Sequence, residues 1–254
     1  MQFAQVIAET RERSGTMSRE EETPSLPHFS RDLESPPHWS TGEHIANPVS
    51  RRASSLALAF VVLCLLVAFE VTRAVDWWGL SLALPLVSYP LDVVASVVTF
   101  LGAASVTGTI AVALSYNWWR RRGEQGLVPL LMFVGVALAA VLKYVLPHPG
   151  PPLEFSRHVQ LPLLLHFAEP LDFHLATPYS FPSGHMLRTT FLVALLSEHW
   201  PRWRAVGWTV ICAMAFTRVY LNDHWVSDVG GGLLLGLTLA AVAASISSRS
   251  PPRR

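Results

Sequence analysis

The sequence predicts an all-α integral membrane protein, a six-helix bundle with both termini in the cytoplasm. Of its 254 residues, 51% are hydrophobic and only 15% are charged, well on the apolar side of ordinary soluble proteins. Six apolar segments each approach the ~20 residues that a helix needs to cross a bilayer. Basic residues also gather at alternate ends of these segments, as the positive-inside rule requires.

The chain divides into two tails and one helical domain. Residues 1–52 are expected to form a disordered polar tail, because prolines lie scattered among Glu, Arg and Ser with no sustained period. Residues 53–248 form the predicted six-helix domain, and residues 249–254 a short basic tail. The predicted membrane segments are 53–75, 91–116, 127–147, 183–199, 204–221 and 226–247.

Charge and tryptophan positions set the predicted topology. An even number of spans places both termini on one side of the membrane. That side carries Arg51, Arg52, Arg120, Arg121, Arg122, Arg202, Arg204, Arg249, Arg253 and Arg254, and the other side carries Arg73, Lys143, Arg157 and Arg218. The arginine-rich side is therefore predicted to be cytoplasmic. Tryptophans near the segment ends suit the headgroup layer and support the same boundaries.

Composition also disfavours several classes of protein. A net charge of +1 leaves no basic excess for a nucleic-acid backbone. Cys64 and Cys212 lie in apolar runs and are expected to be small buried hydrophobes, not a disulfide. No internal repeat is evident, so an inverted-repeat transporter is not favoured. The glycines at 230–232 and 236 are expected to let a neighbouring helix pack closely.

Charged groups interrupt the apolar sequence between residues 217 and 228. His224 and Asp228 are four residues apart, so a helix starting near Trp225 would let the carboxylate reach the imidazole. Such a carboxylate fixes the tautomer and leaves the other ring nitrogen free as a base or nucleophile. Arg218 offers a planar fork suited to phosphate or carboxylate. The alternative interpretation is a salt-bridged helix end.

A second group of polar residues starts the fourth segment. Ser183 is a good N-cap, Gly184 allows a ligand to approach the backbone, and His185 follows directly. The first turn of this helix therefore offers free N–H groups to an anion. Lys143 ends the third segment on the same predicted membrane face, although a lysine there could simply snorkel to the interface. Together these residues predict a cationic anion site with two histidines.

These motifs resemble those of the type 2 phosphatidic acid phosphatase superfamily, the membrane-bound branch of lipid phosphatase and vanadium haloperoxidase-like proteins. The family pattern is Lys, six residues, Arg-Pro; then Pro-Ser-Gly-His; then Ser-Arg, five residues, His, three residues, Asp. The second motif is complete at residues 182–185, and the third has Thr217 in place of Ser. In the first motif, Lys143 is followed after six residues by Gly150 and Pro151. Gly150 therefore stands where the family pattern has its arginine.

The resemblance implies a reaction without metal or cofactor. His224 would attack phosphorus to give a phosphohistidine, oriented by Asp228. His185 would protonate the leaving oxygen and then activate water. The implied phosphate-binding groups are Lys143, Ser183, Gly184 and Arg218. A His-His-Asp metal site is the competing interpretation, disfavoured because the lysine and the arginine would repel a cation.

The missing arginine calls for a replacement. Arg188 lies three residues after His185, on the same helical face, and an unpaired arginine facing lipid would be costly. We therefore expect Arg188 to turn into the pocket and supply the cation. His148 is a weaker candidate, because it would have to carry a proton. The alternative is that Arg188 pairs with a buried group such as Glu70.

The predicted function is that of a membrane phosphatase acting on a lipid phosphate or diphosphate at the non-cytoplasmic face. Phosphatidic acid, phosphatidylglycerol phosphate and polyprenyl diphosphates are the substrates that the resemblance implies, and the sequence does not choose among them. Two alternatives stay open. One is a lipid-phosphate-binding membrane protein with weakened catalysis, and the other is a phosphotransferase in which a second lipid's hydroxyl replaces water. The expected partners are the lipid substrate and the bilayer, and the oligomeric state stays open.

Overall fold

The computed structural model of this protein describes residues 48–157, 159 and 179–248. Within these residues every regular element is a helix, and β pairing is limited to an isolated bridge between Pro149 and Tyr179. The predicted all-α class is therefore confirmed for this part of the chain. Most of the predicted polar tail at 1–52, and the basic tail at 249–254, lie outside the described residues.

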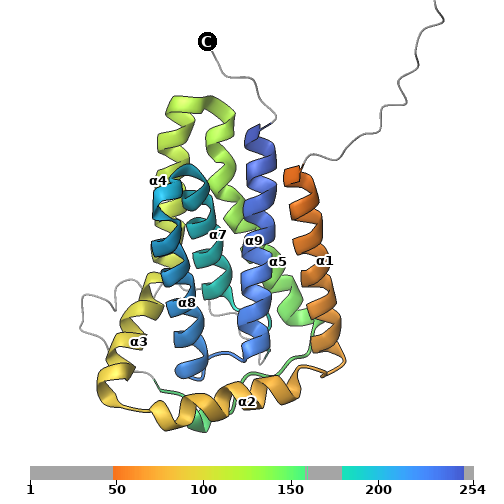
Figure 1. The fold of residues 1–254 in the computed structure, drawn as a ribbon, viewed down its shortest axis with the longest axis vertical. Coiled ribbons are helices and arrows are strands. Elements are labelled where there is room, and N and C mark those ends of the chain that lie inside the picture. The colour runs from red at the N-terminus through yellow and green to blue at the C-terminus, as the bar shows by residue number, and fades with distance from the viewer. Residues whose placement is uncertain (1–47, 158, 160–178, 249–254) are drawn as a thin grey trace, which may run out of the picture. The chain divides into compact units, whose positions relative to one another are not determined.

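The helices follow the predicted segments, except that an additional helix, α2, follows the first segment and the second segment is divided into two helices. They are α1 (Pro48–Ala68), α2 (Arg73–Ala83), α3 (Tyr89–Leu101), α4 (Ala104–Arg122), α5 (Leu131–Val145), α7 (Gly184–His199), α8 (Arg204–Tyr220) and α9 (Val226–Ser248). Short 3₁₀ turns join some of them: η1 (Leu84–Leu86), η2 (Gly123–Leu130), η3 (Leu153–Phe155) and η5 (Pro201–Trp203). In Figure 1, α7, α8 and α9 run side by side and α2 crosses their lower end.

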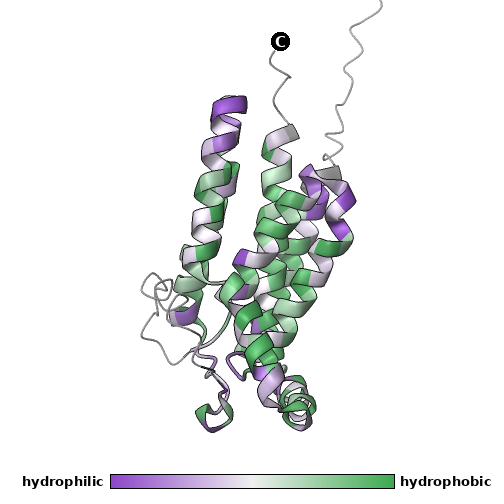
Figure 2. Cartoon of the chain, turned by 90° about the vertical axis from the view of Figure 1, so that its left-hand side faces the viewer, coloured by the Kyte–Doolittle hydropathy of each residue, from purple (hydrophilic) through white to green (hydrophobic). Residues whose placement is uncertain are grey.

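Three stretches of the described residues are long and apolar enough to cross a membrane. They are Arg51–Ala68, Tyr89–Val145 and Val226–Ser247. Large apolar side chains are exposed along the first two, among them Leu58 and Val134, as expected of surfaces that face lipid. Figure 2 shows apolar residues along the helices and hydrophilic residues mainly near their ends. The count of six spans and the side of the termini stay predictions.

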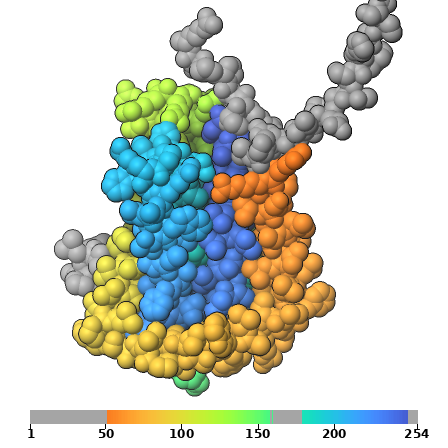
Figure 3. Space-filling model, in the orientation of Figure 1, coloured from red at the N-terminus to blue at the C-terminus, as the bar shows by residue number. Residues whose placement is uncertain are grey.

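The additional helix, α2, comes from a break in the first predicted segment. The helix was expected to continue to residue 75, but α1 ends at Ala68 and Glu70 adopts a left-handed conformation with φ of 57°. The chain then turns into α2, which contacts α8 and α9. In Figure 3 the orange-to-yellow atoms of α2 and α3 form a continuous band across the lower end of the helices. The helix α2 thus covers the end of the bundle where α8 stops and α9 begins.

Two further segments are less regular than predicted. The second segment, expected as one helix over 91–116, breaks at Gly102 into α3 and α4. The third starts as the 3₁₀ turn η2, which contains Pro129, and becomes α-helical only at Leu131. A proline in that turn removes a backbone donor, which disfavours an α-helix there. The break at Gly102 matters for the site, because it leaves a backbone carbonyl without a helical partner.

Close packing of α7 against α9 depends on the glycines of α9. A Cβ at Gly232 would lie 2.5 Å from the backbone oxygen of Ser183, and one at Gly236 would lie 2.8 Å from that of Leu187. A methyl group at either position would therefore collide with the backbone of α7. The predicted role of these glycines in packing agrees with this geometry. The close approach holds the start of α7 beside the start of α9.

Candidate active site

The predicted site residues converge at the end of the helices that α2 crosses. The C-terminal ends of α5 and α8 and the N-terminal ends of α7 and α9 supply them. The backbone N–H of Ser183 donates to the carbonyl oxygen of Asp228 at 3.0 Å, which joins the second motif to the third. Lys143 of the first motif reaches the residues just before the second, because its Nζ donates to the carbonyl oxygens of Ser180 at 2.8 Å and Tyr179 at 3.3 Å.

The third motif forms a buried imidazole–carboxylate pair. The helix α9 begins at Val226, close to the predicted start, and its first turn carries the fully buried Asp228. Oδ2 of Asp228 accepts from the backbone N–H of Trp225 at 2.9 Å and lies 3.1 Å from Nδ1 of His224. With Nδ1 donating to the carboxylate, Nε2 of His224 keeps its lone pair. That atom is the candidate nucleophile.

Electrostatics favour the neutral form of this histidine. Burial lowers the pKa of His224 below its usual value. The hydrogen bond and charge of Asp228 oppose that shift, while the positive charges of Arg218 and Lys143 add to it. A neutral imidazole is the form that can attack phosphorus, so the surroundings suit the predicted nucleophile.

Among the buried polar atoms near this pair that have no hydrogen-bond partner within the described residues, two could donate to a ligand. One is Nε of Arg218, whose Nη1 pairs with Oδ2 of Asp223 at 2.8 Å. The other is Oγ of Ser183, which starts α7 without capping it through its side chain. Buried polar atoms normally find partners, so unpaired ones in a cationic site suit an anionic ligand.

Arg188 lies inside the protein beside the second motif. Its side chain is buried, and Nε and Nη2 donate to the carbonyl oxygen of Gly102 at 3.3 and 2.9 Å. Its Nη1 would lie 3.1 Å from a Cβ at Gly184, so the guanidinium reaches the first turn of α7. His185 also lies near the break, because its Cδ2 would lie 3.1 Å from a Cβ at Gly102. The inward orientation expected of Arg188 thus agrees with the structure.

Glu70, His148 and Gly150, the other residues named in connection with the missing arginine, have different surroundings. Glu70, the alternative partner of Arg188, forms an exposed ion pair with Arg73 at 3.2 Å. His148 directs Nε2 toward carboxylates, 3.6 Å from Asp228 and 3.9 Å from Asp76. Gly150 has room for a side chain, because the nearest atom to a Cβ there is the Cβ of Ser180 at 3.8 Å.

Two residues of this region, Asp76 and Ser227, are not among those predicted from the sequence. Asp76 of α2 is buried, and its carboxylate accepts from the backbone N–H of Ser227 at 2.8 Å and from the Ser227 hydroxyl at 2.9 Å. Ser227 lies on α9 next to Asp228. A lone carboxylate beside two tryptophans in an apolar stretch was the one signal that could have identified Asp76.

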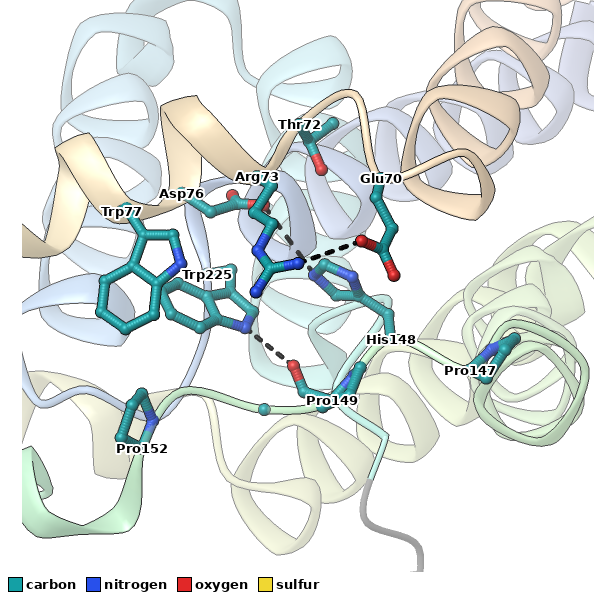
Figure 4. A pocket seen from close by; sticks show the side chains of 11 residues that line it. Glu70, Thr72, Arg73, Asp76, Trp77, Pro147, His148, Pro149, Pro152 and Trp225 are labelled. Carbon is teal, nitrogen blue, oxygen red and sulfur yellow. Dashed lines mark hydrogen bonds and ion pairs between the residues drawn. The ribbon is translucent and has the colours of Figure 1, made fainter.

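A pocket of about 290 Å³ opens beside these residues. Figure 4 shows His148 and Asp76 pointing toward one another in its wall, and the rings of Trp77 and Trp225 lie nearby, tilted by 57° with centroids 5.3 Å apart. The described lining contains His148 and Asp76 but neither His224 nor Arg218. The competing metal-site interpretation would need at least three clustered donors, and the described residues contain no such group with suitable geometry.

Comparison with known proteins gives consistent matches. Residues 124–251 match the model of the PAP2 superfamily. An undecaprenyl-diphosphatase of Sulfolobus acidocaldarius is 30% identical over 139 residues, which span 54% of this chain and 62% of that protein. Phosphatidylglycerophosphatase B of Bacillus subtilis is 29% identical over 199 residues, which span 73% of this chain and 89% of that protein. The crystal structure of a transmembrane PAP2 type phosphatidylglycerolphosphate phosphatase from Bacillus subtilis has a TM-score of 0.62 at 24% identity, covering 80% of this chain and 99% of that one.

Proposed function

Because this chain belongs to the PAP2 superfamily, we propose that it is a membrane-bound phosphatase that hydrolyses a lipid phosphate or diphosphate through a phosphohistidine on His224. The observation that carries the proposal is the buried pair of His224 and Asp228, 3.1 Å apart, with Arg218 and Lys143 close enough to act on the imidazole. A neutral nucleophile beside fixed cations is the arrangement that phosphoryl transfer needs.

The proposed reaction has two steps. In the first, Nε2 of His224 attacks phosphorus, the bond from phosphorus to the lipid oxygen breaks, and His185 gives that oxygen a proton. In the second, His185 takes a proton from water, whose oxygen attacks phosphorus. The phosphorus–nitrogen bond then breaks and releases inorganic phosphate. Asp228 holds the imidazole through both steps and stabilises its positive charge.

Charge stabilisation comes from the surrounding cations and backbone. The unpaired Nε of Arg218 and Oγ of Ser183 are placed to bind phosphate oxygens, together with the N–H groups that start α7. Lys143 adds positive charge. The guanidinium of Arg188, beside Gly184, is the proposed substitute for the arginine that the family pattern has at position 150.

The proposed substrate class follows from two of the relatives. Their names describe action on a polyprenyl diphosphate and on phosphatidylglycerol phosphate, both lipids with a terminal phosphate. The arginine-rich ends of α4 and α8 lie away from the site, which supports an active site at the non-cytoplasmic face. A lipid head exposed at that face is the proposed substrate.

The test is phosphate release by the purified protein in detergent. Phosphatidic acid, phosphatidylglycerol phosphate and a polyprenyl diphosphate are each supplied with and without EDTA. Turnover of at least one lipid that EDTA does not reduce, and that His224→Ala abolishes, is the expected result. Binding without turnover would favour the lipid-binding alternative, and labelled phosphate found on a second lipid would favour a phosphotransferase.

A further inference from the structure

We propose that His148 is a positioning residue for the nucleophile. Its Nε2–H supports the free oxygen of Asp228. Asp76 and Ser227 determine that Nε2, and not Nδ1, carries this hydrogen. This inference rests on the proposed function. It gives His148 a role behind the nucleophile, distinct from the phosphate-binding role considered from the sequence. The residues involved come from α2, the loop after α5, and the first turn of α9.

The two oxygens of Asp228 have unequal surroundings. Oδ2 faces Nδ1 of His224 and accepts from the backbone N–H of Trp225. Oδ1 is buried and has no hydrogen-bond donor within the described residues. Nε2 of His148 lies 3.6 Å from Oδ1, just beyond hydrogen-bond distance. Catalytic hydrogen bonds are often long without substrate and shorten in the complex, so this contact can close during the reaction.

The hydrogen on His148 can be located from its neighbours. The Ser227 hydroxyl donates its single hydrogen to Oδ2 of Asp76 at 2.9 Å. It can therefore only accept from Nε2 of His148, which lies 3.3 Å from Oγ. Nε2 must then carry the hydrogen, and its two nearest acceptors are the Ser227 oxygen at 3.3 Å and the free oxygen of Asp228 at 3.6 Å. Asp76 thus determines, through one hydroxyl group, which ring nitrogen of His148 is a donor.

The rest of His148 is held in place by residues just before the second motif. Its carbonyl oxygen accepts from the backbone N–H of Ser180 at 2.9 Å. Its ring meets the ring of Phe181 edge-on, with centroids 6.4 Å apart. The side chain is 13% exposed, on the side of the pocket in Figure 4. A histidine held at backbone, ring and Nε2 can keep Asp228 in one orientation while His224 gains and loses charge.

The first test compares His148→Leu with His148→Gln. The glutamine nitrogen lies the same number of bonds from Cα as Nε2 of histidine, so it can donate to Asp228, whereas leucine cannot. We expect His148→Leu to lower kcat about ten- to a hundredfold, with little change in KM, because the buried carboxylate loses its support at the nucleophile and not at the substrate. His148→Gln should recover most of that loss.

The second test moves the ring hydrogen of His148 from Nε2 to Nδ1 through a substitution that keeps the shape of the side chain at position 76. In Asp76→Asn the amide can donate to Ser227, whose hydroxyl would then donate to Nε2 of His148 and move the ring hydrogen to Nδ1. The expected result is a loss of kcat comparable to that of His148→Leu. The double variant that combines His148→Leu with Asp76→Asn should have a kcat no lower than that of the slower single variant. Both substitutions remove the same interaction, the hydrogen bond from His148 to Asp228.

The control is His199→Leu, the same substitution in a histidine at the far end of α7. It should keep native kcat, and unfolding midpoints in detergent should show which variants are folded. Equal losses in His148→Leu and His148→Gln, additive losses in the double variant, or native kcat in folded His148→Leu would each overturn the inference. If these outcomes occur while turnover still depends on His224, only the role of His148 fails. Turnover that does not depend on His224 overturns the proposed function as well.

Discussion

Nδ1 of His224 lies 3.1 Å from Oδ2 of Asp228, inside a cluster that also contains Arg218 and Lys143. Burial is the main cause that lowers the pKa of this imidazole, with the two cations adding to the shift and the carboxylate opposing it. The proposed nucleophile, His224, therefore stays neutral at a lower pH than an ordinary histidine.

Arg218→Gln should move the acidic limb of the pH profile to higher pH. Loss of a positive charge makes protonation of His224 easier, so its pKa rises and the neutral form is lost earlier as pH falls. The measurement is kcat/KM from pH 4 to 9, on one lipid so that substrate ionisation is common to all variants. Arg204→Gln, at the far end of α8, is the matched control. An acidic limb that stays in place or moves to lower pH in Arg218→Gln would contradict this electrostatic account.

The role of Arg188 can be separated from a purely structural one. A charge-assisted hydrogen bond contributes roughly 1.5–3 kcal/mol, so Arg188→Ala should lower kcat/KM about ten- to more than a hundredfold, comparable to Arg218→Ala. Because Gly150 has room for a side chain, Gly150→Arg should partly restore activity to Arg188→Ala.

Two results would count against Arg188 as the replacement cation. One is native activity in Arg188→Ala. The other is a Gly150→Arg single variant with sharply raised activity, which would mean that the native site lacks a cation and works with a weaker hold on phosphate. The kcat/KM of Arg188→Lys should fall as far as that of Arg188→Ala, because lysine lacks the planar guanidinium that reaches both Gly102 and the start of α7.

The motifs were predictable from sequence because each is local. The four-residue spacing of His224 and Asp228 requires only one helical turn, and the apolar segments place Lys143 and His185 at the same membrane face. The sequence also suggested that Arg188 turns inward, since a charged side chain toward lipid is costly. These predictions depend on helix geometry and solvation, which the order of residues specifies directly.

The missed features depend on contacts between distant residues. Asp76 is joined to Ser227, far along the chain, through α2, a short helix whose polar residues hid it from a search for apolar spans. From the sequence, His148 was predicted only as a weaker candidate for the missing phosphate-binding cation, because nothing in the neighbouring residues indicates that it faces two carboxylates. The break at Gly102 was missed for the same reason, since its buried carbonyl oxygen accepts a hydrogen bond from the side chain of Arg188 on α7.

The packing of α7 on α9 predicts opposite outcomes for two glycine substitutions. Gly232→Ala should destabilise the protein by about 1–3 kcal/mol, because the methyl group would meet the backbone of Ser183. Gly230→Ala should be neutral or slightly stabilising, because its Cβ meets only a flexible side-chain atom of Leu63 at 3.4 Å and alanine favours helix. Unfolding midpoints in detergent measure both. Equal midpoints would contradict the close helix contact.

The predicted topology can be tested by labelling single cysteines in a background where Cys64 and Cys212 are replaced by alanine. Leu153→Cys lies at a position 87% exposed in the loop after α5 and should react with an impermeant reagent in intact cells. Arg121→Cys, near the arginine-rich end of α4, should react only after the cells are permeabilised. The reverse pattern would place the active site on the cytoplasmic side.

The central claim is that His224 carries the phosphoryl group during turnover. The most direct measurement is rapid acid-free quenching of the enzyme with a lipid carrying labelled phosphate, followed by mass spectrometry of the peptide that contains residues 219–228. We expect an acid-labile phosphate on His224, absent in His224→Ala and reduced in Asp228→Asn, while His185→Ala releases no phosphate. Phosphate release at the native rate by His224→Ala, or label on another residue during turnover, would contradict the claim.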